Sequence, residues 1–135
     1  MALPNGAGGY QLGDGNLSEI TMGYAAAPQT ATSTATLTAA QVTGGMLVAN
    51  PSTSAATYTL PTAAAIDAVV SSAKVGSTFQ LSLVNTGTSS GAVTLATATG
   101  LTDGGNAFVA VAITSSAVFT FRKTGDAAWT VYKSA

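Results

Sequence analysis

The sequence contains no cysteine and no histidine. Without cysteine it has neither a disulfide framework nor a thiolate metal site, and without histidine it has no imidazole to serve as a metal ligand or a base. No apolar run reaches the ~18 residues that a membrane helix needs, and the N-terminus has neither a basic segment nor a continuous apolar one. We therefore expect neither a membrane span nor a secretion signal.

Charged residues are scarce. They make up 7% of the chain, against about 25% in ordinary globular proteins, and alanine, threonine, serine and glycine take their place. The formal net charge of -1 argues against nucleic acid as a partner, because phosphate binding needs clustered lysine and arginine. A chain this poor in charge is expected to hold much of its surface against partners. The alternative is a neutral β-domain that its hydroxyl groups keep in solution.

The ionisable residues form no catalytic pattern. General acid–base catalysis needs two titratable groups in one cleft, but the carboxylates are scattered along the chain. They are Asp14, Glu19, Asp67, Asp103 and Asp126. The glycines of residues 6–15 match neither the dinucleotide-binding nor the Walker spacing. Asp103 and Asn106 could approach a calcium ion, but a plain turn suits a single carboxylate better. We expect no enzyme activity, no cofactor and no metal.

The stretch 57–85 predicts a strand, a helix and a second strand in direct succession, and the rest of the fold is expected to build on it. Apolar residues recur at helical spacing over about ten residues. They are Ala63, Ile66, Val69, Val70 and Ala73. Thr62 can cap this helix, and Asp67, its only carboxylate, lies off the apolar stripe and is expected to be solvated. Residues 79–83 alternate apolar and polar side chains, which predicts one apolar strand face beneath the helix.

Apolar residues alternating with polar or small ones predict further strands. Their ranges are 46–50, 56–60, 92–96, 108–114, 117–123 and 128–133. Residues 92–96 are expected to form a hairpin with residues 79–85, and the glycine-rich residues 97–106 to form a loop. The last two strands are expected to place in the core Phe119, Phe121, Trp129 and Val131. No internal repeat of fixed period is present, which argues against a solenoid or a propeller.

Together these elements predict a mainly β fold: an antiparallel β-sandwich or barrel-like domain with one short α-helix, preceded by an extended N-terminal arm. Residues 1–36 are expected to be arm and linker, because residues 25–36 are a low-complexity spacer of alanine, threonine and serine. Thr38 and Gln41 match a capping box at the start of a short turn. Residues 37–135 are expected to form the β-rich domain.

The first 24 residues hold six glycines and no sustained period, which favours an extended arm. This arm nevertheless carries apolar side chains that a purely solvated segment would lack. The candidate anchors for a partner surface are Leu3, Tyr10, Leu12, Ile20, Met22 and Tyr24. We predict that the arm becomes ordered on another protein, at an entropic cost that these anchors offset. The alternative is a glycine-rich loop that folds back on its own domain.

Four segments and the opening MALPNGAGGYQ carry a family resemblance. The segments are TLTAAQVTGGMLVANP, AATYTLPTAAAIDA, FQLSLVNTG and FTFRKTGDAAWTVYK. They resemble the small decoration, or cement, proteins on the heads of tailed bacteriophages, and the likeness runs from Thr36 to the C-terminus. The resemblance implies a protein that is made in the host cytoplasm and binds the outer surface of the capsid. There it is expected to bridge subunits of the major capsid protein, as a homotrimer.

Similar domains also occur in phage fibre proteins. The alternative function is therefore a head-fibre or tail-fibre module that binds a host receptor or glycan, with Tyr58 or Tyr132 as exposed aromatic contacts. A cell-surface adhesin would normally carry a secretion signal, and none is seen. We expect a structural virion protein whose binding follows shape and apolar burial and depends little on salt.

Overall fold

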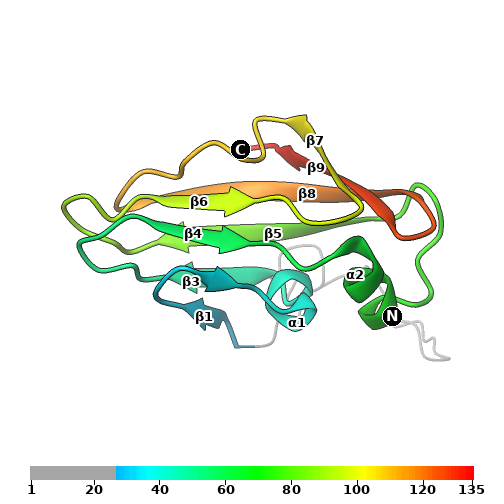
Figure 1. The fold of residues 1–135 in the computed structure, drawn as a ribbon, viewed down its shortest axis with the longest axis horizontal. Coiled ribbons are helices and arrows are strands. Elements are labelled where there is room, and N and C mark those ends of the chain that lie inside the picture. The colour runs from blue at the N-terminus through cyan, green and yellow to red at the C-terminus, as the bar shows by residue number, and fades with distance from the viewer. Residues whose placement is uncertain (1–26) are drawn as a thin grey trace, which may run out of the picture.

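Nine strands and two helices make up residues 27–135, the part of the chain that the computed structural model describes (Figure 1). The strands are β1 (Gln29–Ala31), β2 (Ala35–Thr36), β3 (Met46–Ala49), β4 (Ala56–Thr59), β5 (Thr78–Asn85), β6 (Val93–Ala96), β7 (Leu101–Gly105), β8 (Ser115–Gly125) and β9 (Ala128–Lys133). The helices are α1 (Ala39–Thr43) and α2 (Ala63–Val69). The fold is mainly β, as predicted, but it has two helices where the sequence predicted one.

The described strands form two mixed sheets. One has six strands in the order β1-β3-β5-β8-β9-β7, and the other has three in the order β2-β4-β6. Among the described strands, only β8 pairs antiparallel with its neighbours, β5 and β9, and all other pairs are parallel. The prediction of an antiparallel fold is therefore wrong. The predicted hairpin of β5 and β6 is also wrong, because these strands belong to different sheets.

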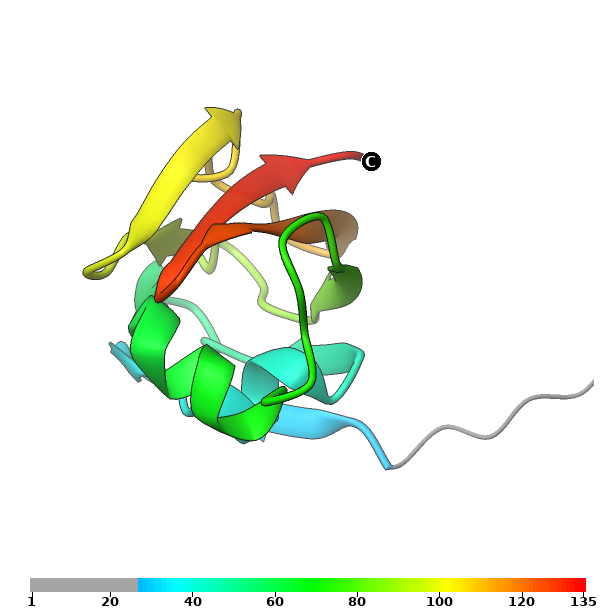
Figure 2. The same cartoon turned by 90° about the vertical axis from the view of Figure 1, so that its right-hand side faces the viewer.

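From β1 to β6, consecutive strands alternate between the sheets and build three stacked coils. β1 and β2 form the first coil, β3 and β4 the second, and β5 and β6 the third, with α1 and α2 as the links between coils. The two helices contact each other along one side of the stack (Figure 2). This arrangement is solenoid-like, which the lack of a fixed repeat had argued against.

The coils contain different numbers of residues, so their stacking cannot be recognised as a repeat in the sequence. The register aligns Gln29 with Leu47 and Leu47 with Leu83, so the same position recurs after 18 residues and then after 36 residues. A sequence scan for repeats detects a constant period. Stacking with such unequal spacing leaves no constant period to detect.

Side-chain caps set the start of both helices. The Thr38 hydroxyl accepts from Gln41 N at 3.2 Å and Thr38 N donates to Gln41 Oε1 at 2.9 Å, which confirms the predicted capping box. Thr62 caps α2 through its hydroxyl, as predicted. The helix is shorter than expected, however, because it ends at Val69, which is exposed.

The core lies between the inner faces of the two sheets. The predicted core residues Phe119, Phe121, Trp129 and Val131 are all buried. Tyr58 and Leu95 from the three-stranded sheet pack in the same cluster. Phe79 stacks on Phe121 with ring centroids 4.7 Å apart. Each large buried side chain contributes about 1.5–3 kcal/mol, so this cluster is the main source of stability.

The segment 97–114 differs most from its prediction. Its expected loop contains β7, which pairs in parallel with β9, and Gly104 leaves the space that the Tyr132 ring occupies. Its expected strand at 108–114 is mostly irregular, and only Val111 forms a bridge, to Val93. Alternation was a poor guide here because turns occupy residues 107–108 and 113–114 and leave only a short irregular stretch between them.

The predicted linker contributes to the sheets. β1 and β2 both lie within residues 25–36. The turn between them is held by Tyr58, whose hydroxyl donates to Thr32 O at 2.7 Å. Gln41 Nε2 donates to Thr30 O at 2.9 Å. The spacer is thus part of the hydrogen-bonded fold from Gln29 onward, and the division into arm and domain stays a prediction.

Candidate functional site

The predicted arm anchors fall outside the described residues. These anchors are Leu3, Tyr10, Leu12, Ile20, Met22 and Tyr24. The described chain begins at Ala27, which is exposed and leads directly into β1 at one edge of the six-stranded sheet. The surface around this entry point is therefore the part of the described protein closest in sequence to the anchors.

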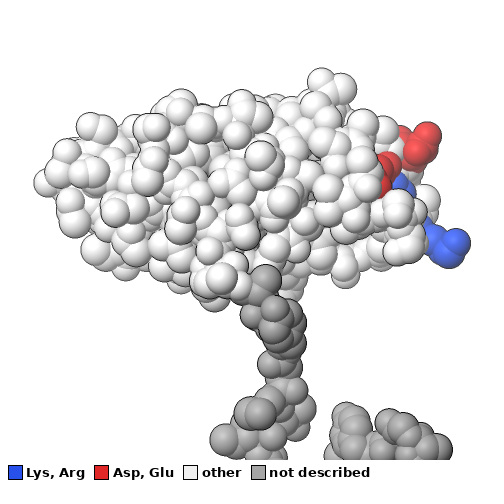
Figure 3. Space-filling view, turned by 90° about the horizontal axis from the view of Figure 1, so that it is seen from below, with Lys and Arg blue, Asp and Glu red and all other residues white. Residues whose placement is uncertain are grey.

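This surface carries no charge. Residues 27–66, which span the first two coils and the start of α2, include no lysine, arginine, aspartate or glutamate. In Figure 3 the side that bears β1 and α1 is white, and the charged side chains in view gather at one end. Surfaces that face water normally mix both signs of charge. We take the charge-free surface of the first two coils as the candidate interaction surface.

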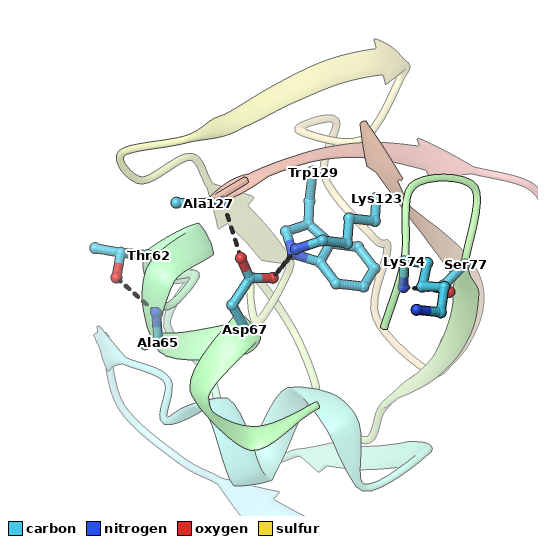
Figure 4. A network of polar contacts seen from close by, with 8 residues as sticks. All are labelled: Thr62, Ala65, Asp67, Lys74, Ser77, Lys123, Ala127 and Trp129. Atoms are coloured by element: carbon cyan, nitrogen blue, oxygen red, sulfur yellow. Dashed lines mark hydrogen bonds and ion pairs between the residues drawn. The ribbon is translucent and has the colours of Figure 1, made fainter. Parts of the chain in front are cut away.

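Asp67 is the centre of a hydrogen-bond network at the charged end of the domain (Figure 4). Its carboxylate accepts hydrogen bonds from Lys123 Nζ, from Trp129 Nε1 at 2.8 Å and from Ala127 N at 2.8 Å. Asp67 was expected to be solvated, and that expectation is wrong. The partners come from β8, β9 and the turn between them, more than 50 residues away in sequence. The network therefore joins α2 to strands β8 and β9 of the six-stranded sheet.

The Asp67 network predicts an acid-sensitive fold. The hydrogen bonds from Lys123 and Trp129 lower the pKa of Asp67 below its ordinary value. The resulting stability is complete above the unfolded-state pKa of ~3.9 and is lost as the pH falls through the lower pKa of the folded protein. We expect denaturant midpoints to decline below about pH 4, and Asp67→Asn to lower the midpoint at pH 7 and flatten this decline.

The exposed Asp126 provides the matched control for this experiment. Asp126→Asn removes a carboxylate from the same turn region and should leave the pH dependence of the denaturant midpoint unchanged. If the curves of Asp67→Asn and the original protein run parallel from pH 7 to pH 2, the network does not carry the acid sensitivity.

One hollow of about 380 Å³ lies beside the ends of β5 and β8. Its lining residues are Val84, Asn85, Thr86, Thr114, Ser115 and Ser116. The Asn85 amide group donates to the carbonyl oxygens of Gly91, Val111 and Ala112, and its oxygen accepts from Gly87 N. The one amide in the hollow is thus already engaged, and the hydroxyls around it do not form an acid–base pair.

The described residues contain no group of three or more histidine, cysteine, aspartate or glutamate side chains placed to hold an ion. Asp103 instead stabilises a turn, because its Oδ1 accepts from Gly105 N at 2.9 Å and from Ala107 N at 3.0 Å. Within residues 27–135 no helix has the length and apolar character to cross a bilayer.

The two tyrosines proposed as glycan contacts differ in exposure. Tyr58 is fully buried and fixes the first coil through Thr32, so its expected exposure is wrong. Tyr132 is half-buried and its ring covers Gly104. No family model, curated protein or solved structure matches the chain. The chain's own sequence and geometry therefore carry the proposal of function.

Proposed function

We propose that this protein is a structural component of a phage virion that binds the outside of the capsid and bridges subunits of the major capsid protein. The observation that carries the proposal is the absence of charge from residues 27–66, which include β1, the first strand of the described chain, at the sheet edge. The resemblance of four segments to capsid decoration proteins supports it.

The mechanism is physical. A capsid shell under the pressure of a packed genome opens only when its subunits separate. A protein that spans two subunits adds buried area that must be exposed first. Specific interfaces bury roughly 800 Å² on each partner. A sandwich-like domain with an apolar arm supplies such area from two surfaces, and assembly as a homotrimer would multiply the contacts.

Removal of the arm is expected to abolish binding. A chain lacking residues 1–24 should still fold, because the sheets begin at β1, but it should not sediment with empty heads of the major capsid protein. Leu3→Ser, Tyr10→Ser and Leu12→Ser combined should weaken binding by at least ~100-fold. Raising the salt to 1 M should change it by less than about threefold.

A polar triple variant is the matched control. Asn5→Ser, Gln11→Ser and Asn16→Ser alter the same part of the chain without removing apolar area, and this variant should bind heads as the full chain does. Retained binding after removal of residues 1–24 would count against the arm, and loss of binding in the control would count against apolar anchoring.

A fibre module is the second candidate, because Tyr132 stays partly exposed. A glycan array distinguishes the two functions. A capsid decoration protein should bind no glycan, whereas a fibre module should bind one, and its Tyr132→Ala variant should no longer bind that glycan.

A further inference from the structure

The outward face of the six-stranded sheet carries an apolar stripe. Leu47 of β3, Leu83 of β5 and Ala117 of β8 are buried in the core, so the residues that flank them along each strand point outward. The register places Val48 beside Val84 and aligns Met46 with Ser82 and Val118. We define the outer apolar stripe as Met46, Val48, Val84 and Val118.

The rest of residues 27–135 covers this stripe only in part. The helices lie along the side of the stack, and the three-stranded sheet shares the opposite, inner face through the common core. Met46 is 41% exposed, and Val48, Val84 and Val118 are half-buried, so part of the stripe faces water. Exposed apolar area costs about 25 cal/mol per Å², so a segment that covers the stripe stabilises the protein.

The N-terminal segment joins the sheet next to the stripe. Gln29 pairs with Leu47, so Pro28 enters beside Met46. Four residues separate Tyr24 from Gln29, so their Cα atoms can lie about 16 Å apart in an extended chain, whereas β5 lies two strand spacings, or about 10 Å, from β1. Tyr24 can therefore reach Val84 within the same chain.

The sequence before this junction has a matching pattern. Ile20, Met22 and Tyr24 alternate with other residues, so an extended chain presents all three on one face. Residues 1–26 contain two acidic residues and no basic one, a charge of -2, whereas residues 27–135 contain four basic and three acidic residues, a charge of +1. Arg122, on the outward face of β8, lies within reach of a segment that begins at Glu19.

We propose that residues 19–24 bind across the outer apolar stripe of their own chain, with Ile20, Met22 and Tyr24 against the sheet and Glu19 toward Arg122. A tethered segment has an effective concentration in the millimolar range, so it occupies a complementary surface before a separate molecule does. This contact is independent of capsid binding, because Leu3, Tyr10 and Leu12 remain available to a shell.

Disulfide trapping tests the proposal, and the absence of native cysteine removes background reactions. In the full chain, Met22→Cys with Val84→Cys should form an intrachain disulfide under mild oxidation, because the proposed contact brings the Cα atoms within the ~4.4–6.8 Å that a disulfide needs. Met22→Cys with Val118→Cys should do the same and serves as a second variant if Val84→Cys fails to fold.

The matched control is Met22→Cys with Thr94→Cys. Thr94 is half-buried, like Val84, but lies on the outward face of the three-stranded sheet. We expect its intrachain crosslinking to be at least tenfold slower. Equal rates in the pairs and the control would overturn the proposal, and so would disulfides that join two chains, because a second copy would then fill the stripe.

A charge variant tests the orientation. Arg122 is exposed, so Arg122→Glu should fold normally and slow the intrachain crosslink of the Met22 and Val84 positions by roughly threefold. Arg122→Lys should leave the rate unchanged. An unaltered rate in Arg122→Glu would overturn the contact with Glu19.

Discussion

Asn85→Asp is expected to destabilise the fold by about 3–5 kcal/mol, although the two side chains have nearly the same shape. Asn85 is 1% exposed and lies at the end of β5, where its amide nitrogen donates to three carbonyl oxygens. The substitution replaces that nitrogen with an oxygen that faces Gly91 O, Val111 O and Ala112 O. A buried carboxylate then meets three acceptors and no donor on that side.

The loss should be visible as a lower denaturant midpoint in the fluorescence of Trp129, the single tryptophan and itself buried. A typical domain has only about 5–15 kcal/mol of stability, so a sizeable part of it depends on this amide. Asn50→Asp is the matched control. Asn50 is exposed and its oxygen accepts from Ser52 N, a bond that aspartate retains. It should change stability by less than about 0.5 kcal/mol.

If Asn85→Asp and Asn50→Asp were equally stable at pH 7, the three carbonyl contacts of Asn85 would have no energetic role. Apolar packing alone would then stabilise the third coil, formed by β5 and β6. Partial recovery of Asn85→Asp in acid would support the electrostatic explanation, because a protonated carboxyl can donate one hydrogen bond.

Local pattern predicted the C-terminal hairpin well. Phe119 and Phe121 of β8 are separated by Thr120, Trp129 and Val131 of β9 are separated by Thr130, and Phe121 faces Val131 across the pair. The two strands are neighbours in sequence, joined by a tight turn. Side-chain alternation therefore identified both the buried face and the pairing partner.

Pairing between distant strands had no such signal. Alternation shows which residues of β5 point inward, but it does not tell whether the partner is β6, seven residues further on, or β3, whose Leu47 precedes Leu83 by 36 residues. Parallel pairing needs a crossover connection, and here residues 50–77, which include β4 of the other sheet and α2, provide it. Packing in the core that both sheets share determines that β5 pairs with β3, and a local sequence pattern carries no information about that packing.

The candidate site was partly predictable for the same reason. The scarcity of charge over the first two coils can be counted in the sequence. The hydrogen-bond network of Asp67 could not be predicted from the sequence. The position of Asp67 off the apolar stripe of α2 indicates exposure, and its partners Lys123 and Trp129 come from strands more than 55 residues later. The signal that could have found it is weak: Lys123 alternates with Phe121 and so belongs to the inward face of β8.

Gly100→Ala is expected to destabilise the fold by about 2–4 kcal/mol, because it adds both backbone strain and a steric clash. Gly100 has a φ of +86°, which disfavours any side chain. An added Cβ would also lie 2.6 Å from the Cβ of Ala63 and would overlap Ala127 O. The turn before β7 packs here against the start of α2, where Ala63 N donates to Thr99 O at 3.0 Å.

Two further alanine variants isolate each cost. Gly45 has a φ of +92° and open space around its Cβ position, so Gly45→Ala should cost only the backbone strain, about 1 kcal/mol. Gly105 has neither a positive φ nor a neighbour within 4 Å, so Gly105→Ala should be nearly neutral. Denaturant unfolding of the three variants should rank them Gly100, Gly45, Gly105 from largest to smallest loss. Equal losses at Gly100 and Gly45 would mean that α2 shifts to admit the methyl group, and that the contact between the third coil and α2 is loose.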